Sequence, residues 1–194
     1  MARTALLLLL ALLQVQAASR TNEPESSESG VTPRDNAVML VVLERLLAEG
    51  KMDPFVPPGD PSKPLLFDLE PICNSVTADQ VLEPSDEKEW EGLTDAEQAA
   101  VREAAENLVA RAKSCAGEFT ISHPRIQLRR GDPPGTGIFD RTSAAFLPGF
   151  SRDGRTALVL LSIPWSIHGA SGTHVLVLQD GEWQIRVRDF AYYL

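Results

Sequence analysis

The strongest constraint on the fold lies near the C-terminus, where Asp180-Gly181 separates two runs of alternating apolar and polar residues. Residues 173–179 and 182–188 show the period of two that is typical of a half-buried β-strand. An Asp-Gly pair between such runs favours a two-residue type I′ turn, in which both central residues have positive φ. The sequence therefore predicts an antiparallel hairpin that pairs Leu178 with Trp183, Leu176 with Ile185, and His174 with Val187.

The two faces of this hairpin are expected to differ in character. The six paired residues are expected to face the core. Trp165 is expected to come near Arg186 and Arg188, and an aromatic side chain among arginines is typical of recognition sites. An alternative is that Trp165 folds onto the sheet and covers its edge. The opposite, partly wet and cationic face is expected to carry Val175, Val177, Gln184, Arg186 and Arg188.

Two segments upstream of the hairpin predict helices. Thr32 is suited to cap a helix over residues 33–49, and Gly50 is suited to end it. Residues 94–97 (Thr-Asp-Ala-Glu) form a capping box, in which each side chain satisfies the other residue's backbone N–H. Apolar residues recur at helical spacing from there to Cys115, which indicates a second helix with one buried stripe.

Extended segments follow and separate these helices. A short strand is predicted at 65–69 and an alternating one at 125–129. A kinked or edge strand is predicted at 143–151, because Pro148-Gly149 interrupts it. The continuous apolar run 156–163 suits a central strand that is covered on both faces.

The order of these elements predicts an α+β fold, with two N-terminal helices packed on a C-terminal antiparallel sheet of about four strands. At the level of fold this arrangement is similar to cystatin-like and nuclear-transport-factor-2-like cones. Such an analogy carries no activity with it.

The N-terminus has the pattern of a secretory signal peptide. Arg3 precedes an apolar run at 5–13, and residues 15–17 (Val-Gln-Ala) supply a cleavage signature. The alternative, an uncleaved membrane anchor, requires a run of about 18–20 apolar residues, which this one does not reach. The cut is expected after Ala17 or Ala18.

Three parts of the chain follow from this cleavage. Residues 1–17 are the signal peptide, and residues 18–31 form an acidic leader with too little apolar surface to fold. Residues 32–194 are expected to form a single domain. The predicted location is secreted or periplasmic, with no stable membrane insertion after cleavage.

The charge of the chain argues against nucleic acid and anionic membranes as partners. Removal of the signal takes away one base, Arg3, which leaves 17 bases against 27 acids, a formal net charge of −10. A phosphate backbone requires clustered cations, which this acidic chain lacks. An unknown protein or small molecule is therefore the expected ligand.

The chain has two cysteines, Cys73 and Cys115. An even count in an exported protein indicates a disulfide, and only one intramolecular pairing exists. The alternative is two buried free thiols.

One resemblance supports export. The segment from Phe150 to Val159, with Ala157-Leu158-Val159, and the later Gly181-Glu182-Trp183-Gln184-Ile185 resemble a group of uncharacterised exported bacterial proteins that carry an A-L-V and a G-x-W-x-V/I hairpin. The match covers about 45 residues. In that group the intervening loop often carries two cysteines, whereas residues 164–172 here carry none. The resemblance implies export and fold, and it implies no chemistry.

The candidate catalytic residues are His168, Ser171 and His174, which flank an expected Ser-Gly loop. Ser171 is a possible nucleophile with either histidine as its base. However, the segment lacks the Gly-x-Ser-x-Gly spacing of a nucleophile elbow, so a turn is the simpler interpretation. With His123 the histidines could form a zinc site, but no spacing requires it. No metal and no cofactor are predicted.

Three further motifs have simpler explanations. Residues 130–132 (Arg-Gly-Asp) match an integrin-binding tripeptide, but a match of only three residues is best explained by chance. Residues 131–137 are glycine-rich but lack the Lys and Ser/Thr of a phosphate loop. The acidic residues between Glu83 and Glu97 are expected to be solvated, and carboxylate chemistry needs burial.

The sequence thus predicts an exported, non-catalytic binding or interaction domain, with Trp165, Arg186 and Arg188 as its binding residues. The alternative is an extracytoplasmic hydrolase that uses the His168–Ser171–His174 segment. The absence of catalytic motifs favours the binding domain.

Overall fold

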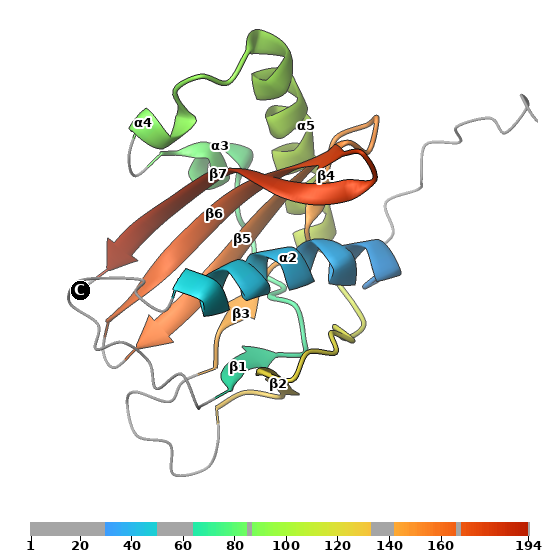
Figure 1. Ribbon diagram of the computed structural model, residues 1–194, viewed down its shortest axis with the longest axis vertical. Coiled ribbons are helices and arrows are strands. Elements are labelled where there is room, and N and C mark those ends of the chain that lie inside the picture. Colours follow the sequence, from blue (N-terminus) through green and yellow to red (C-terminus); the bar gives the residue numbers. More distant parts are fainter. Residues whose placement is uncertain (1–29, 50–63, 85–86, 133–141, 166–167, 194) are drawn as a thin grey trace, which may run out of the picture.

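The computed structural model describes residues 30–49, 64–84, 87–132, 142–165 and 168–193. The predicted α+β class with an antiparallel sheet is confirmed (Figure 1). The predicted signal peptide and acidic leader lie outside the described residues, apart from Gly30 and Val31. The sheet contains five strands, in the order β3-β5-β6-β7 with β4 also on β5: β3 (Ala144–Ala145), β4 (Gly149–Phe150), β5 (Thr156–Trp165), β6 (His168–Gln179) and β7 (Glu182–Tyr193).

The fifth strand comes from the segment that was predicted to kink. Pro148 and Gly149 divide it into β3 and β4, which pair separately with β5. Pro148 cannot donate to a ladder, so the strand breaks there.

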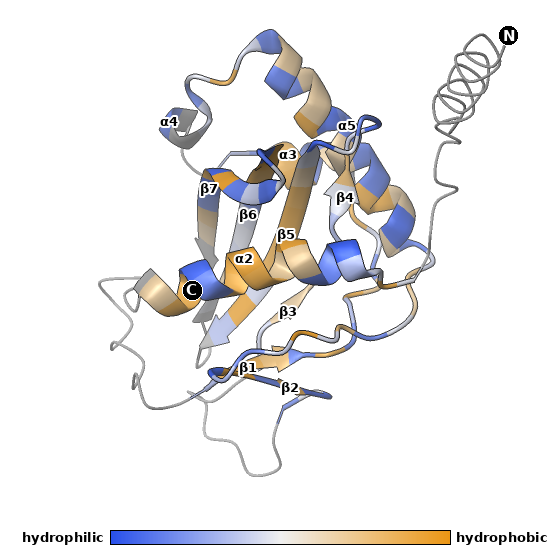
Figure 2. Cartoon of the chain, turned by 45° about the vertical axis from the view of Figure 1, so that its right-hand side comes forward, coloured by the Kyte–Doolittle hydropathy of each residue, from blue (hydrophilic) through white to orange (hydrophobic). Residues whose placement is uncertain are grey.

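Helices cover both faces of the sheet. The helix α2 (Pro33–Glu49) packs with Ala157, Val159 and Leu161 of β5 in one cluster, whereas α5 (Asp95–Ala112) packs with Leu158 in a second. Because neighbouring residues of a strand point to opposite faces, the two helices lie on opposite sides of β5. The middle of α2 and most of β5 are hydrophobic (Figure 2). The prediction of a central strand covered on both faces is therefore confirmed.

Two short helices were not predicted. They are α3 (Ala78–Leu82) and α4 (Glu87–Trp90), in the acidic connector before α5. Thr77 caps α3 with a capping box, and Thr94 caps α5 with the one that the sequence predicts. The Thr77 box was missed because only one helical turn follows it.

The C-terminal hairpin has the predicted turn but not the whole predicted register. Asp180 and Gly181 have φ of 52° and 87°, as a type I′ turn requires. The pairs Leu178–Trp183 and Leu176–Ile185 are confirmed. The pair His174–Val187 is wrong, because a β-bulge places Arg188 opposite His174 and Val187 opposite Val175.

The expected wet face is covered in part. Val175 is buried in the cluster with α5, where Val187 joins it, whereas Gln184 and Arg186 are exposed. The extra residue on β7 is Arg186, since Ile185 pairs with Leu176 and Val187 with Val175. A bulge reverses the alternation beyond it, so Arg188 lies on the face of Ile185.

The expected Ser-Gly loop is wrong for most of its length. Strand β5 continues to Trp165, and β6 begins at His168, so residues 169–172 are paired on both sides. Residues 166–167 lie outside the described part of the chain. Gly172 pairs with Phe190 in the sheet. The Phe190 ring fills the space of a side chain at this position, because a Cβ on Gly172 would lie 2.6 Å from the ring.

A second, two-stranded sheet lies beside the β3 end of the first. The predicted strands near 65–69 and 125–129 are confirmed as β1 (Leu65–Asp68) and β2 (Ile126–Arg129). They pair in parallel, which was not expected, and Phe67 of β1 forms an isolated bridge with Ser143. This small sheet closes the end of the α2 cluster through Phe67, which is fully buried.

The Cys73–Cys115 disulfide is confirmed, with the two Cα atoms 5.7 Å apart. It ties the loop after β1 to the segment that follows α5. Within the described ranges, none of the helices is long and apolar enough to cross a membrane.

Candidate functional site

The three candidate catalytic residues all lie on β6, and the structure does not bring them together. Ser171 and His174 are three positions apart on one strand, so their side chains leave opposite faces. His168 is six positions from His174, which separates the two backbones by ~20 Å. The hydrolase hypothesis therefore gains no support from geometry.

His174 has the environment of a core residue. It is fully buried, and its ring meets Phe190 edge-on with the centroids 5.4 Å apart. Neither ring nitrogen has a hydrogen-bond partner in the part of the chain that the structure describes. Burial, with a smaller contribution from the Arg188 charge, lowers the pKa of His174 to about 3. A neutral imidazole with so low a pKa is a poor general base near pH 7.

The expected third histidine does not complete a metal site. His123 lies before β2, where its Nδ1 accepts a hydrogen bond from the backbone N–H of Arg125 at 3.1 Å. Over the described ranges, no group of three or more His, Cys, Asp or Glu side chains is placed to hold a metal ion.

Two of the predicted binding residues, Arg186 and Arg188, line a groove between α2 and β7. The groove has a volume of about 610 Å³. Its lining combines apolar side chains with three arginines and one glutamate: Val41, Glu44, Arg45 and Ala48 from α2, and Ile185, Arg186, Val187 and Arg188 from β7.

Four consecutive residues of β7 reach this groove because it lies at the border of the sheet. Strand β7 is the last in the order β3-β5-β6-β7, so both of its faces approach the same edge. Arg188 lies on the α2 side, with its guanidinium carbon 4.4 Å from the centre of the Phe190 ring. Arg186 points to the other side, where it donates to the Gly92 carbonyl at 3.0 Å and lies 3.5 Å from Glu97.

The α2 wall of the groove comes from the outer face of the helix. Glu44, Arg45 and Ala48 are exposed, whereas Val42 and Leu43 point into the core. The helical period of residues 33–49 predicts that these residues share one face of the helix. The sequence does not show which strand lies beside that face. The sequence analysis therefore missed Arg45.

The backbone of Trp165 lies far from the two arginines. Its backbone pairs with His168, whereas Arg188 pairs with His174 one strand further on. The offset of six positions along β6 corresponds to ~20 Å. The predicted surface is thus reduced to its two arginines, and α2 supplies the third.

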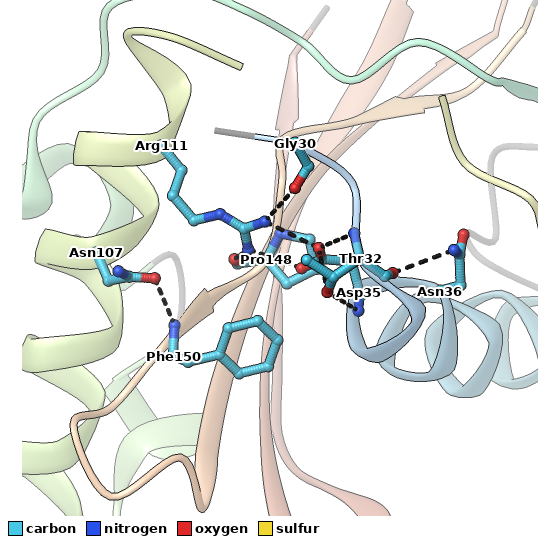
Figure 3. A network of polar contacts seen from close by, with 8 residues as sticks. All are labelled: Gly30, Thr32, Asp35, Asn36, Asn107, Arg111, Pro148 and Phe150. Atoms are coloured by element: carbon cyan, nitrogen blue, oxygen red, sulfur yellow. Dashed lines mark hydrogen bonds and ion pairs between the residues drawn. The ribbon is translucent and has the colours of Figure 1, made fainter. Parts of the chain in front are cut away.

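A buried polar network was also missed (Figure 3). Arg111 of α5 binds the Asp35 carboxylate through both of its terminal nitrogens, at 2.7 and 2.8 Å. The same guanidinium donates to the carbonyl of Gly30 at 3.0 Å and to that of Pro148. Asp35 also accepts from the backbone N–H of Thr32 at 2.7 Å. Because every charged group is satisfied from within the protein, this network is structural.

The Arg-Gly-Asp tripeptide is held by its neighbours. Arg130 forms ion pairs with Glu70 and Glu118, and an Asp132 carboxylate oxygen accepts from the backbone N–H of Thr142 at 2.7 Å. These contacts engage the two charged side chains that an integrin would recognise.

The fold and the groove define a helix-covered α+β domain with a basic, partly apolar groove at the edge of its sheet. Comparison with known proteins adds no relative: no family model, no curated protein and no solved structure matches the chain.

Proposed function

We propose that this protein is an exported, non-catalytic binding domain, and that its ligand site is the groove between α2 and β7. The observation that carries this proposal is the groove itself. Its volume of about 610 Å³ falls within the range of ~300–1,000 Å³ that is usual for ligand sites.

The lining of the groove indicates an anionic ligand with apolar groups. Arg45 and Arg188 stand beside one glutamate, Glu44, there, although the protein as a whole is acidic. Val41 and Ile185 supply apolar surface beside these charges. Arginine is suited to carboxylate and phosphate groups because its planar fork can donate two parallel hydrogen bonds.

Export is part of the proposal. The signal-peptide pattern at 1–17 and the resemblance to exported bacterial proteins support it, and a disulfide is typical of an oxidising compartment. The location would be the periplasm or the extracellular space. A cone of the cystatin-like or nuclear-transport-factor-2-like kind is the finer fold assignment that we propose.

Sequencing the N-terminus of the protein recovered outside the cytoplasm tests export. The expected first residue is Ala18 or Ser19, which corresponds to cleavage after Ala17 or Ala18. A protein that retains Met1 and stays in the cytoplasm would contradict export without bearing on the groove.

A pair of fluorescent probes tests the groove. Anilinonaphthalene sulfonate carries an anionic and an apolar part, and N-phenylnaphthylamine is its neutral counterpart. We expect saturable binding of the sulfonate, and weaker binding of the neutral probe.

A matched pair of variants tests whether the sulfonate binds in the groove. Ala48→Trp fills the groove from an exposed position of α2, whereas Ala110→Trp adds the same bulk at an exposed position of α5. Ala48→Trp should abolish sulfonate binding and Ala110→Trp should leave it unchanged, with the circular dichroism of both variants like that of the wild type. Equal binding by all three proteins would overturn the proposal.

A further inference from the structure

Strand β7 presents a long edge beside the groove. It has 12 residues, Glu182–Tyr193, and pairs with β6 on one side only. Over the described ranges, no strand pairs with its other side. Alternate residues of such a strand direct their N–H and C=O groups away from the sheet, where another chain can pair with them.

Helices stand on both sides of this edge. On one face, α2 supplies the groove wall with Val41 and Arg45. On the other face, α4 is held to β7, because Trp90 donates from its indole N–H to Asp189 at 3.0 Å. The carbonyl of Gly92, just after α4, accepts from Arg186. The free edge of β7 is therefore flanked by α2 on one face of the sheet and by α4 on the other.

We propose that the groove binds an extended acidic segment of a partner protein, which adds to the sheet as a strand beside β7. This inference rests on the proposed function and names the ligand class. Backbone hydrogen bonds to β7 supply affinity in this mode, and alternate side chains supply specificity. The β7 part of the groove, residues 185–188, spans about 13 Å, so about four residues of an added strand lie along it and a six-residue segment extends past it by about one residue at each end.

Charge selects the partner. Arg45 and Arg188 stand on the α2 side of the edge, so acidic side chains on that face of the added strand meet two guanidinium groups, whereas Arg186 on the α4 side binds Gly92 and Glu97. A second copy of this chain fits less well. Pairing β7 with its own copy about a twofold axis would bring two sets of Arg186 and Arg188 together, and like charges across a strand pair are destabilising.

The test uses short peptides and the whole exported protein. The probe is acetyl-Glu-Val-Glu-Val-Glu-Val-amide, with acetyl-Lys-Val-Lys-Val-Lys-Val-amide as its charge control. Two further peptides have the acidic sequence and carry N-methyl groups either on every Glu or on every Val nitrogen. Methylation removes the strand donors of one edge and leaves the side chains intact. Calorimetry gives each dissociation constant, and amide hydrogen exchange reports on β7.

The proposal predicts binding of the acidic peptide and little or none of the lysine peptide. One of the two methylated peptides should bind about tenfold more weakly, because it loses two or more backbone hydrogen bonds. Exchange of the β7 amides that point away from β6 should slow in the complex. Equal affinity of all three acidic peptides, or protection elsewhere than β7, would overturn strand addition.

Two arginine variants test whether the charge in the groove contributes to peptide affinity. Arg45→Gln should weaken the acidic peptide about threefold, as expected for one exposed charge. Arg152→Gln removes another exposed arginine, from the turn before β5, and should change nothing. If anilinonaphthalene sulfonate binds the groove and no peptide does, strand addition fails while the proposed function stands. If neither binds, both fail.

Discussion

Arg111 and Asp35 form a bidentate ion pair that joins the two helices covering opposite faces of the sheet. The two nitrogen–oxygen distances are 2.7 and 2.8 Å, and both side chains are at least 95% buried. Arg111 also binds the carbonyls of Gly30 and Pro148. One guanidinium thus fixes the start of α2, the end of α5 and the approach to β4 relative to one another.

Removal of one partner of this pair should be costly. Asp35→Asn leaves the Arg111 charge buried without its counter-ion, which should lower the free energy of unfolding by about 3–5 kcal/mol. Urea unfolding measures the loss. The control is Arg102→Met, which breaks the exposed pair with Asp79 and should cost less than about 1 kcal/mol. Similar losses in the two variants would contradict the structural role of the buried pair.

Gly149 should not accept a side chain. A Cβ at this position would lie 2.0 Å from the Ala104 carbonyl oxygen and 2.5 Å from the Leu108 backbone nitrogen. These are backbone atoms of α5, which cannot move away as a flexible side chain could. Gly149→Ala should therefore lower the free energy of unfolding by about 3 kcal/mol or more. Gly30→Ala is the control, because no atom lies within 4 Å of its Cβ. A thermal midpoint for Gly149→Ala equal to that of the control would contradict this packing of β4 on α5.

The sequence predicts local features of this fold well and long-range ones poorly. The Asp180-Gly181 turn and the Thr94 capping box depend on neighbouring residues, and both were predicted. The bulge at Arg186 has no local signature, because it follows from how β7 packs between helices. It changed the partner of His174, and it separated Arg186 from Arg188.

The candidate site was predicted only in part, because it combines residues that are close in sequence with one that is remote. Arg186 and Arg188 were singled out because the predicted hairpin register placed them on one face, whereas the bulge places them on opposite faces. Arg45 lies more than 100 residues away in the sequence and joins them only through packing of α2 on the sheet. The Asp35–Arg111 pair is equally remote in sequence. The Ser-Gly composition of residues 169–172 favoured a loop, but pairing on both sides made it a strand.

His174 should make the fold less stable in mild acid. Its pKa is lowered to about 3 in the folded protein, against about 6.5 in the unfolded chain. Between these values the unfolded state binds a proton that the folded state does not, so stability falls as the pH drops below 6.5. The loss at pH 5 should be about 2 kcal/mol.

His174→Leu isolates this effect. Leucine does not titrate, so the variant should lack the loss of about 2 kcal/mol between pH 7.5 and pH 5. It also removes two buried nitrogens that have no partner in the described part of the chain, so at pH 7.5 it should be at least as stable as the wild type. Urea unfolding at the two pH values measures both quantities. Parallel losses in the two proteins would show that His174 does not titrate as proposed.

The disulfide should stabilise the protein chiefly through the unfolded state. The Cys73–Cys115 bond closes a loop with a sequence separation of 42 residues, which corresponds to about 4 kcal/mol of loop-closure entropy. Replacing both cysteines with serine should lower the urea midpoint accordingly. A reducing agent should lower the midpoint of the wild type and leave that of the double variant unchanged. Equal midpoints for oxidised and reduced protein would contradict this account.

The groove between α2 and β7 is the central claim, and a map of backbone amide shifts tests it most directly. The measurement is a nitrogen-15 NMR titration of the protein with anilinonaphthalene sulfonate. We predict saturable shift changes that centre on Val41, Arg45, Ala48 and residues 185–188. Shift changes that centre on α5 or the β1–β2 sheet instead, or none at saturating probe, would contradict the groove as the ligand site.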